Sequence, residues 1–157
     1  MNVVLVEPEI PPNTGNVARL CAATGATLHL VGPLGFRLDD RELKRAGMDY
    51  WEQVTWKYWE TLEELRMADR RLRSDEEKPT FYYVTTKSMR PYTEPRYKQG
   101  DYLVFGRETA GLPKELLDAN AETTITIPMF NPQARSLNLA TAVAIVLYEA
   151  IRQVKGF

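Results

Sequence analysis

Short apolar runs bounded by polar, glycine or proline residues recur along the chain, a pattern typical of buried β-strands. One further run, residues 51–59, is aromatic and partly alternating, and it is interpreted as a strand as well. The predicted strands are residues 3–6, 27–31, 51–59, 81–85, 102–105 and 124–127.

Between these runs, apolar residues recur at the spacing of an α-helix. Gly25 ends the first helical segment, Thr61 and Glu64 form a capping-box pattern, and Pro113 suits a first turn. The last segment is apolar on nearly every face, which predicts that it is buried on most sides. The predicted helices are residues 16–24, 40–46, 61–73, 113–119 and 139–154.

Strands that alternate with helices predict an α/β fold, with a mostly parallel sheet flanked by helices and one domain over residues 1–157. Ligands of such sheets bind outside the carboxyl ends of the strands. We therefore expect the functional site in the loops that follow four of the strands. These loops are residues 8–16, 85–90, 106–113 and 128–138.

The charge balance gives no direct sign of a nucleic-acid partner. Lys and Arg number 20 against 21 Asp and Glu, for a net charge of −1, whereas a dedicated nucleic-acid domain is often strongly basic. Any RNA contact must come from local clusters or from charge pooled across subunits. The candidate clusters, which are also ordinary for solvated surface, are Arg41, Lys44 and Arg45, and Arg66, Arg70, Arg71 and Arg73.

Single copies of cysteine and histidine exclude several kinds of chemistry. Cys21 alone cannot form an internal disulfide, and with His29 it supplies too few ligands for a zinc site, so no metal is expected. His29 lies in mid-strand, which disfavours a Ser-His-Asp hydrolase. With no leader pattern and no apolar run long enough for a bilayer, we expect a soluble cytoplasmic protein.

Two features near the start of the chain suggest ligand contacts. Residues 13–16 open the first predicted helix, where free N–H groups suit a phosphate, or Gly15 simply eases a capping turn. Neither the P-loop sequence nor a GxGxxG fingerprint is present. Arg19 follows within the helix among small residues, and it either reaches the site or forms an ordinary salt bridge.

The later loops add further candidates. Gly106 and Gly111 let a backbone approach a ligand closely, and Glu108 either caps a helix or orders the loop through backbone N–H groups. Ser136 or Asn138 is the expected cap of the final helix. Tyr148 lies on that helix and either finds a hydrogen-bond partner at the edge of the core or acts in the site.

Taken in order, these segments resemble the SPOUT superfamily of RNA methyltransferases, in particular its tRNA (cytidine/uridine-2′-O-) methyltransferase branch, which acts at the wobble nucleotide. The resemblance implies a C-terminal deep trefoil knot, S-adenosylmethionine as methyl donor, and a homodimer that shares its active sites across the final helix. The matching segments are residues 7–21, 45–50, 85–87, 101–113, 127–129 and 135–139.

The resemblance also assigns roles to residues. Arg19, Asn138 and Tyr148 are the expected catalytic residues, with Arg19 acting electrostatically because a guanidinium is almost never neutral. The expected cofactor contacts are Val84, Thr85, Gly106, Ile127, Met129, Ser136 and Leu137. The expected contacts to the tRNA anticodon stem-loop are Asn13, Arg41, Lys44 and Arg45.

Other functions stay open at this point. The same chemistry on ribosomal RNA or at another tRNA position is one alternative, and a non-catalytic RNA-binding or assembly factor with the same fold is another. A dehydrogenase is disfavoured because the glycine fingerprint is missing. The sequence also departs from some relatives, which carry Pro and Arg at the second and fifth places of residues 106–111, and residues 51–78 show no family signature.

Overall fold

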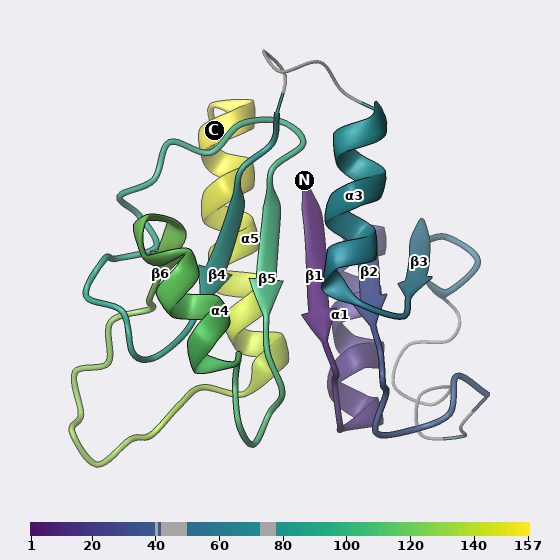
Figure 1. Ribbon diagram of the computed structural model, residues 1–157, viewed down its shortest axis with the longest axis horizontal. Helices are drawn as coiled ribbons and strands as arrows, with labels where there is room; N and C mark the ends of the chain where they lie inside the picture. Colours follow the sequence, from purple (N-terminus) through teal and green to yellow (C-terminus); the bar gives the residue numbers. More distant parts are fainter. Residues whose placement is uncertain (40, 42–49, 73–77) are drawn as a thin grey trace.

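The computed structural model describes residues 1–39, 41, 50–72 and 78–157, which form a six-stranded sheet in the order β3-β2-β1-β5-β4-β6 (Figure 1). Every strand pair is parallel, which confirms the predicted fold class. The strands are β1 Asn2–Val6, β2 Thr27–Val31, β3 Trp56–Trp59, β4 Phe81–Val84, β5 Tyr102–Phe105 and β6 Thr124–Ile125. The helices are α1 Pro11–Thr24, α3 Leu62–Leu72, α4 Lys114–Ala119, the 3-10 helix η3 Ala121–Thr123 and α5 Leu139–Lys155.

The helices cover both faces of the sheet and make three layers (Figure 1). On one face, α1 and α5 pack against each other and against inward side chains of the central strands, such as Leu5 and Leu103. On the other face, α3 and α4 cover a smaller cluster that contains Val4, Tyr83 and Val104. Because successive strand residues face opposite sides, the continuous apolar runs serve both layers.

From β1 the chain continues to β2 and β3 toward one edge of the sheet, whereas β5, the other neighbour of β1, is followed by β6 toward the opposite edge. The segments after β1 and β5 therefore lead away from each other, to opposite faces of the sheet. A crevice at this point is the usual ligand site of an open parallel sheet. Leu5 of β1 pairs with Phe105 of β5, so the loops that begin at Glu7 and Gly106 start side by side.

Helix α1 begins at Pro11, five residues before the predicted start at residue 16. Pro11 and Pro12 occupy the first two helical positions, where their fixed φ favours the helix and their missing N–H is not needed. The N–H groups of Asn13 and Thr14 both donate to the Ile10 carbonyl, at 3.1 and 3.4 Å. Asn13 and Thr14 therefore do not offer free N–H groups to a phosphate, which argues against that alternative for residues 13–16.

Several other predicted boundaries can be compared with the structure. Thr61 and Glu64 do form a cap, since Glu64 N–H donates to Thr61 Oγ1 and Glu60 N–H donates to the Glu64 carboxylate. Strand β3 starts at Trp56 rather than at residue 51, because residues 50–54 fold into a turn. Strand β6 ends at Ile125 rather than at residue 127. The helix predicted at residues 40–46 lies outside the described residues, apart from residue 41.

Two expectations concern the chain as a whole. The trefoil knot stays a prediction. None of the described helices combines the length and the apolar character that a membrane crossing needs.

Candidate active site

A cavity of about 560 Å³ opens at the carboxyl ends of the strands, among the loops after β4, β5 and β6. Its volume lies in the range of small-molecule sites, about 300–1,000 Å³. All seven residues that the sequence assigned to the cofactor line it, although their roles stay predictions. They are Val84, Thr85, Gly106, Ile127, Met129, Ser136 and Leu137.

The loop after β5 folds back on itself as a tight hairpin. Gly111 N–H donates to the Arg107 carbonyl at 2.9 Å, and Arg107 N–H donates to the Gly111 carbonyl at 3.3 Å. A Cβ on Gly106 would lie 2.1 Å from the Gly111 carbonyl carbon, and Gly111 itself has φ +66°. Both positions therefore require glycine, one for space and the other for backbone conformation.

Glu108 at the tip of this hairpin reaches the start of α1. Its carboxylate accepts the Glu9 N–H at 2.8 Å, the Ile10 N–H at 3.1 Å and the Asn13 Nδ2–H at 3.2 Å. In return the Glu9 carboxylate accepts both the N–H and the hydroxyl of Thr109. An acidic group also stabilises the positive end of a helix, so Glu108 orders two loops at once.

Asn13 extends this connection to α5. Its Oδ1 accepts a hydrogen bond from Asn138 Nδ2 at 2.9 Å, and Asn138 Oδ1 caps α5 by accepting the N–H groups of Ala140 and Thr141. Asn138 is thus the cap, as expected. The amide of Asn13 is buried and bonded at both ends, so it joins the start of α1 to the loop after β5 and to the loop before α5. Its predicted contact with a substrate stays a prediction.

Arg19 and Tyr148 lie on the layer formed by α1 and α5, and neither side chain is among those that line the cavity. Arg19 is exposed on α1, and its Cζ lies 5.1 Å from the centre of the Tyr50 ring. Tyr148 is 47% exposed on α5, so its hydroxyl is not held in the core of this chain. Within one chain, then, the structure does not bring these two residues into the cavity.

The predicted basic contacts are resolved only in part. Arg41 is exposed, whereas Lys44 and Arg45 lie outside the described residues. Arg107 lines the cavity and pairs with Glu7, a residue with φ 50° at the end of β1. Glu7 was not among the predicted site residues, although an acid directly after a buried strand was a usable signal.

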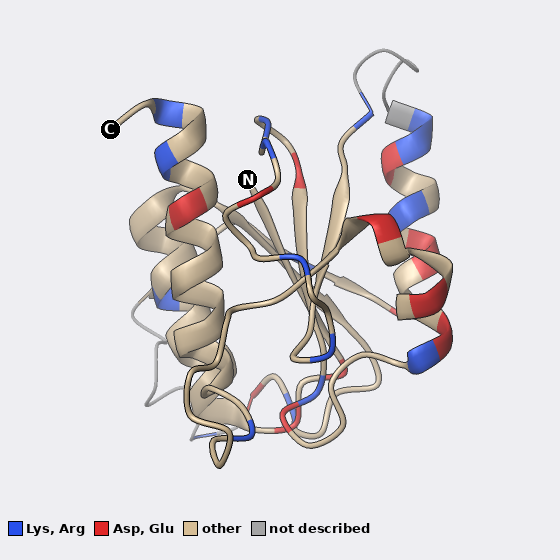
Figure 2. Cartoon of the chain, turned by 90° about the vertical axis from the view of Figure 1, so that its left-hand side faces the viewer, with Lys and Arg blue, Asp and Glu red and all other residues tan. Residues whose placement is uncertain are grey.

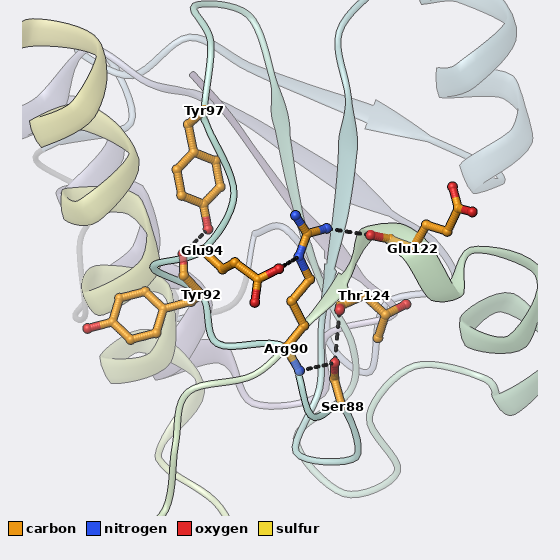
Figure 3. A network of polar contacts seen from close by, with 7 residues as sticks. All are labelled: Ser88, Arg90, Tyr92, Glu94, Tyr97, Glu122 and Thr124. Carbon is orange, nitrogen blue, oxygen red and sulfur yellow. Dashed lines mark hydrogen bonds and ion pairs between the residues drawn. The ribbon is translucent and has the colours of Figure 1, made fainter.

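A second polar network holds the cavity wall formed by the segment after β4 (Figure 3). Ser88 Oγ donates to the Thr124 carbonyl at 2.8 Å and accepts the Arg90 N–H at 3.1 Å. The Arg90 guanidinium donates to the Glu94 carboxylate and to the Glu122 carbonyl. These bonds fasten the segment to β6 and so fix the neighbouring Thr85 beside the cavity.

The single histidine and cysteine have structural roles away from the cavity. Burial, with a smaller effect from Lys57, lowers the pKa of His29 to about 4. The neutral His29 ring lies between Asn2 Oδ1 at 3.2 Å and Trp59 Nε1 at 3.0 Å. Burial raises the pKa of the Cys21 thiol to about 12. Across the described part of the chain, no three His, Cys, Asp or Glu side chains gather as a metal site.

Comparisons with known proteins agree with this geometry. The chain is 49% identical over 157 residues to the tRNA (cytidine(34)-2′-O)-methyltransferase of Escherichia coli strain K12, covering 98% of this chain and 93% of that protein. A solved structure concerned with 2-OH methylation of C/U34 on tRNA matches with a TM-score of 0.89 at 43% identity, over 99% of this chain and 97% of that one.

A second solved structure contains the cofactor. The SpoU methyltransferase AviRb of Streptomyces viridochromogenes, in complex with AdoMet, matches with a TM-score of 0.86 at 25% identity, over 98% of this chain and 57% of that one. The model of the SpoU rRNA Methylase family matches residues 1–148. These matches confirm the resemblance found in the sequence, and the chain belongs to the SpoU methylase family of RNA methyltransferases.

Proposed function

We propose that this enzyme transfers a methyl group from S-adenosylmethionine to the ribose 2′-hydroxyl of the wobble pyrimidine of a tRNA. The observation that carries the proposal is the convergence of the family's motif loops on one cavity, in a chain 49% identical to a tRNA (cytidine(34)-2′-O)-methyltransferase. Residues 1–157 act as one catalytic domain.

The cavity suits the proposed cofactor in size and in chemistry. Apolar side chains such as Val84, Ile127 and Leu137 offer a surface for a flat adenine ring, while Thr85 and Ser136 offer hydroxyls. Gly106 and Gly111 both line the cavity, and because they carry no side chain a ligand can approach the backbone closely there. The bound sulfonium supplies an electrophilic methyl group, so the protein has to place and activate the ribose hydroxyl.

Arg19 supplies the activation. Its guanidinium stays charged, so it cannot take the proton from the hydroxyl, but it stabilises negative charge that develops on the 2′-oxygen and holds the neighbouring phosphate. Asn138 sits at the mouth of the cavity with its Oδ1 capping α5, and it orients the ribose or the arginine. Alignment of the reacting atoms is itself worth several kcal/mol, on the order of 7–11 in favourable cases.

The catalytic site is completed by a second subunit in a homodimer. Arg19 and Tyr148 are exposed on the α1 and α5 layer instead of lining the cavity of their own chain. The charged residues of α5 are confined to its C-terminal end, whereas α3 carries charge along its length (Figure 2). A largely uncharged helix face with a partly exposed tyrosine is typical of a subunit interface.

The direct test is methyl transfer from labelled S-adenosylmethionine to bulk tRNA that lacks the modification, followed by nucleoside analysis. We expect label in a 2′-O-methylated cytidine or uridine. If only added ribosomal RNA became labelled, the enzyme would instead be a 2′-O-methyltransferase of ribosomal RNA, the first alternative. Binding of tRNA without any measurable affinity for the cofactor would favour the binding-factor alternative, and an Arg19→Ala variant with full activity would refute the central role of that residue.

A further inference from the structure

Among the described residues, the partner of the Arg19 side chain is an aromatic ring instead of a carboxylate. Its Cζ lies 5.1 Å from the centre of the Tyr50 ring, within the range of a cation–π contact. Arg19 forms no side-chain hydrogen bond or ion pair with any residue that the structure describes. Other arginines are bound to carboxylates, among them Arg90, Arg107 and Arg152.

Both sides of this contact are rigid. The Tyr50 carbonyl accepts N–H bonds from Gln53 at 2.9 Å and from Val54 at 3.0 Å, which fixes the turn that follows β2 and precedes β3. The next side chain, Trp51, packs against the main core cluster. Arg19 extends from a helix whose opposite face is fully buried. The ring therefore stays in a defined place on the surface of α1.

A ring and a carboxylate affect an arginine differently. A carboxylate takes up the N–H donors of the guanidinium and cancels its charge, whereas the face of a ring attracts the charge and leaves the donors at the guanidinium edge open. Open donors and an uncancelled charge are what a phosphate and a developing oxyanion require.

We propose that Tyr50 is a positioning residue for Arg19: its ring fixes the guanidinium on the surface of α1, from which it completes the site of the proposed dimer, while leaving the N–H donors available to the RNA. The inference rests on the proposed function, since it assigns Tyr50 a role in that reaction. Tyr50 itself touches no reacting atom. Its effect passes through the orientation of Arg19, so the ring matters and the hydroxyl does not.

The kinetic test compares variants that keep or remove the ring. Tyr50→Phe should retain kcat within about twofold, while Tyr50→Leu and Tyr50→Gln should both lose about two- to fivefold, the equivalent of an exposed cation–π contact. The KM for tRNA should change less than kcat, because the charge that Arg19 stabilises on the 2′-oxygen develops only in the transition state, whereas the phosphate is one of many contacts to the tRNA. Tyr58→Leu, at an exposed tyrosine of β3 bonded to Glu60, is the matched control and should keep wild-type kcat.

A second readout does not depend on activity. The NMR resonance of the Arg19 Nε–H, assigned by its absence in Arg19→Lys, should be shifted upfield by the ring current of Tyr50. The shift should persist in Tyr50→Phe and vanish in Tyr50→Leu. The inference about Tyr50 would be overturned if the Arg19 resonance were unchanged in Tyr50→Leu, or if Tyr50→Leu and Tyr50→Gln both kept wild-type kcat. Either result would leave the proposed function intact. A wild-type enzyme that methylates no tRNA would instead refute the proposed function.

Discussion

Replacing Gly106 with alanine tests whether the backbone hairpin after β5 shapes the proposed cofactor cavity. The new Cβ would lie 2.1 Å from the Gly111 carbonyl carbon, where ordinary contact begins at 3.4 Å, so the two strands of the hairpin must separate by about 1.3 Å. Backbone lies on both sides of the clash and cannot rotate away. The substitution should lower the free energy of unfolding by about 2–3 kcal/mol, which is the upper part of the range for overpacked sites.

The assays are thermal unfolding at fixed protein concentration and titration with S-adenosylmethionine by calorimetry. For a chain of this size the loss corresponds to a fall in Tm of roughly 4–12 °C. Cofactor affinity should fall by at least about tenfold, or about 1.4 kcal/mol, because the displaced hairpin forms one wall of the cavity.

The matched control is Gly25→Ala, at the C-terminal end of α1. Gly25 has φ +71° with nothing within 4 Å of an added Cβ, so alanine there introduces backbone strain without a clash. It should cost about 1–2 kcal/mol of stability and leave cofactor affinity unchanged. Wild-type affinity in Gly106→Ala, or an equal loss of affinity in Gly25→Ala, would refute the reasoning.

Three further predictions concern stability and reactivity. Asn138→Ala removes the cap of α5 and should cost about 1 kcal/mol in urea unfolding, whereas Asn138→Ser should restore most of it; equal values for the two variants would argue against the cap. His29 is neutral in the fold because its pKa drops from 6.5 to about 4, so the unfolded chain binds more protons between these values and stability falls as pH decreases through them. The free energy of unfolding should fall by about 2 kcal/mol between pH 7 and pH 5, and His29→Gln should reduce this pH dependence. If the free energy of unfolding of His29→Gln changed with pH as in the wild type, His29 would not be the source. Cys21, buried with its pKa raised to about 12, should react with a thiol reagent only after unfolding, and rapid labelling of the native enzyme would contradict its burial.

Hydrophobic patterning predicted the sheet well because its strands are buried on both faces. The runs at residues 27–31 and 102–105 match β2 and β5 residue for residue. Patterning was less reliable where tertiary contacts decide the conformation. The start of α1 is set by Pro11 and Pro12 together with the Glu108 carboxylate, which comes from a distant loop. Hydrogen bonds there join Glu108, Asn13 and Asn138, three residues that are far apart in the chain.

The predicted cofactor contacts came from the family resemblance rather than from physical reasoning. Taken singly, the loops at Gly106 and Ser136 read as ordinary connections, and only their order along the chain indicated one site. The contact of Arg19 with Tyr50 lay beyond sequence reasoning, because no periodicity relates a helix residue to a turn on the far side of β2. The pairing of Glu7 with Arg107 was missed for the same reason.

The central claim is methylation of one ribose oxygen, and removing that oxygen tests it most directly. Two synthetic tRNAs would be compared, one with the normal wobble ribose and one with a 2′-deoxy sugar at that nucleotide alone. Both should bind the enzyme with similar affinity, and labelled methyl should enter only the first. Equal labelling of the two tRNAs would contradict the account, because the methyl acceptor would then lie elsewhere.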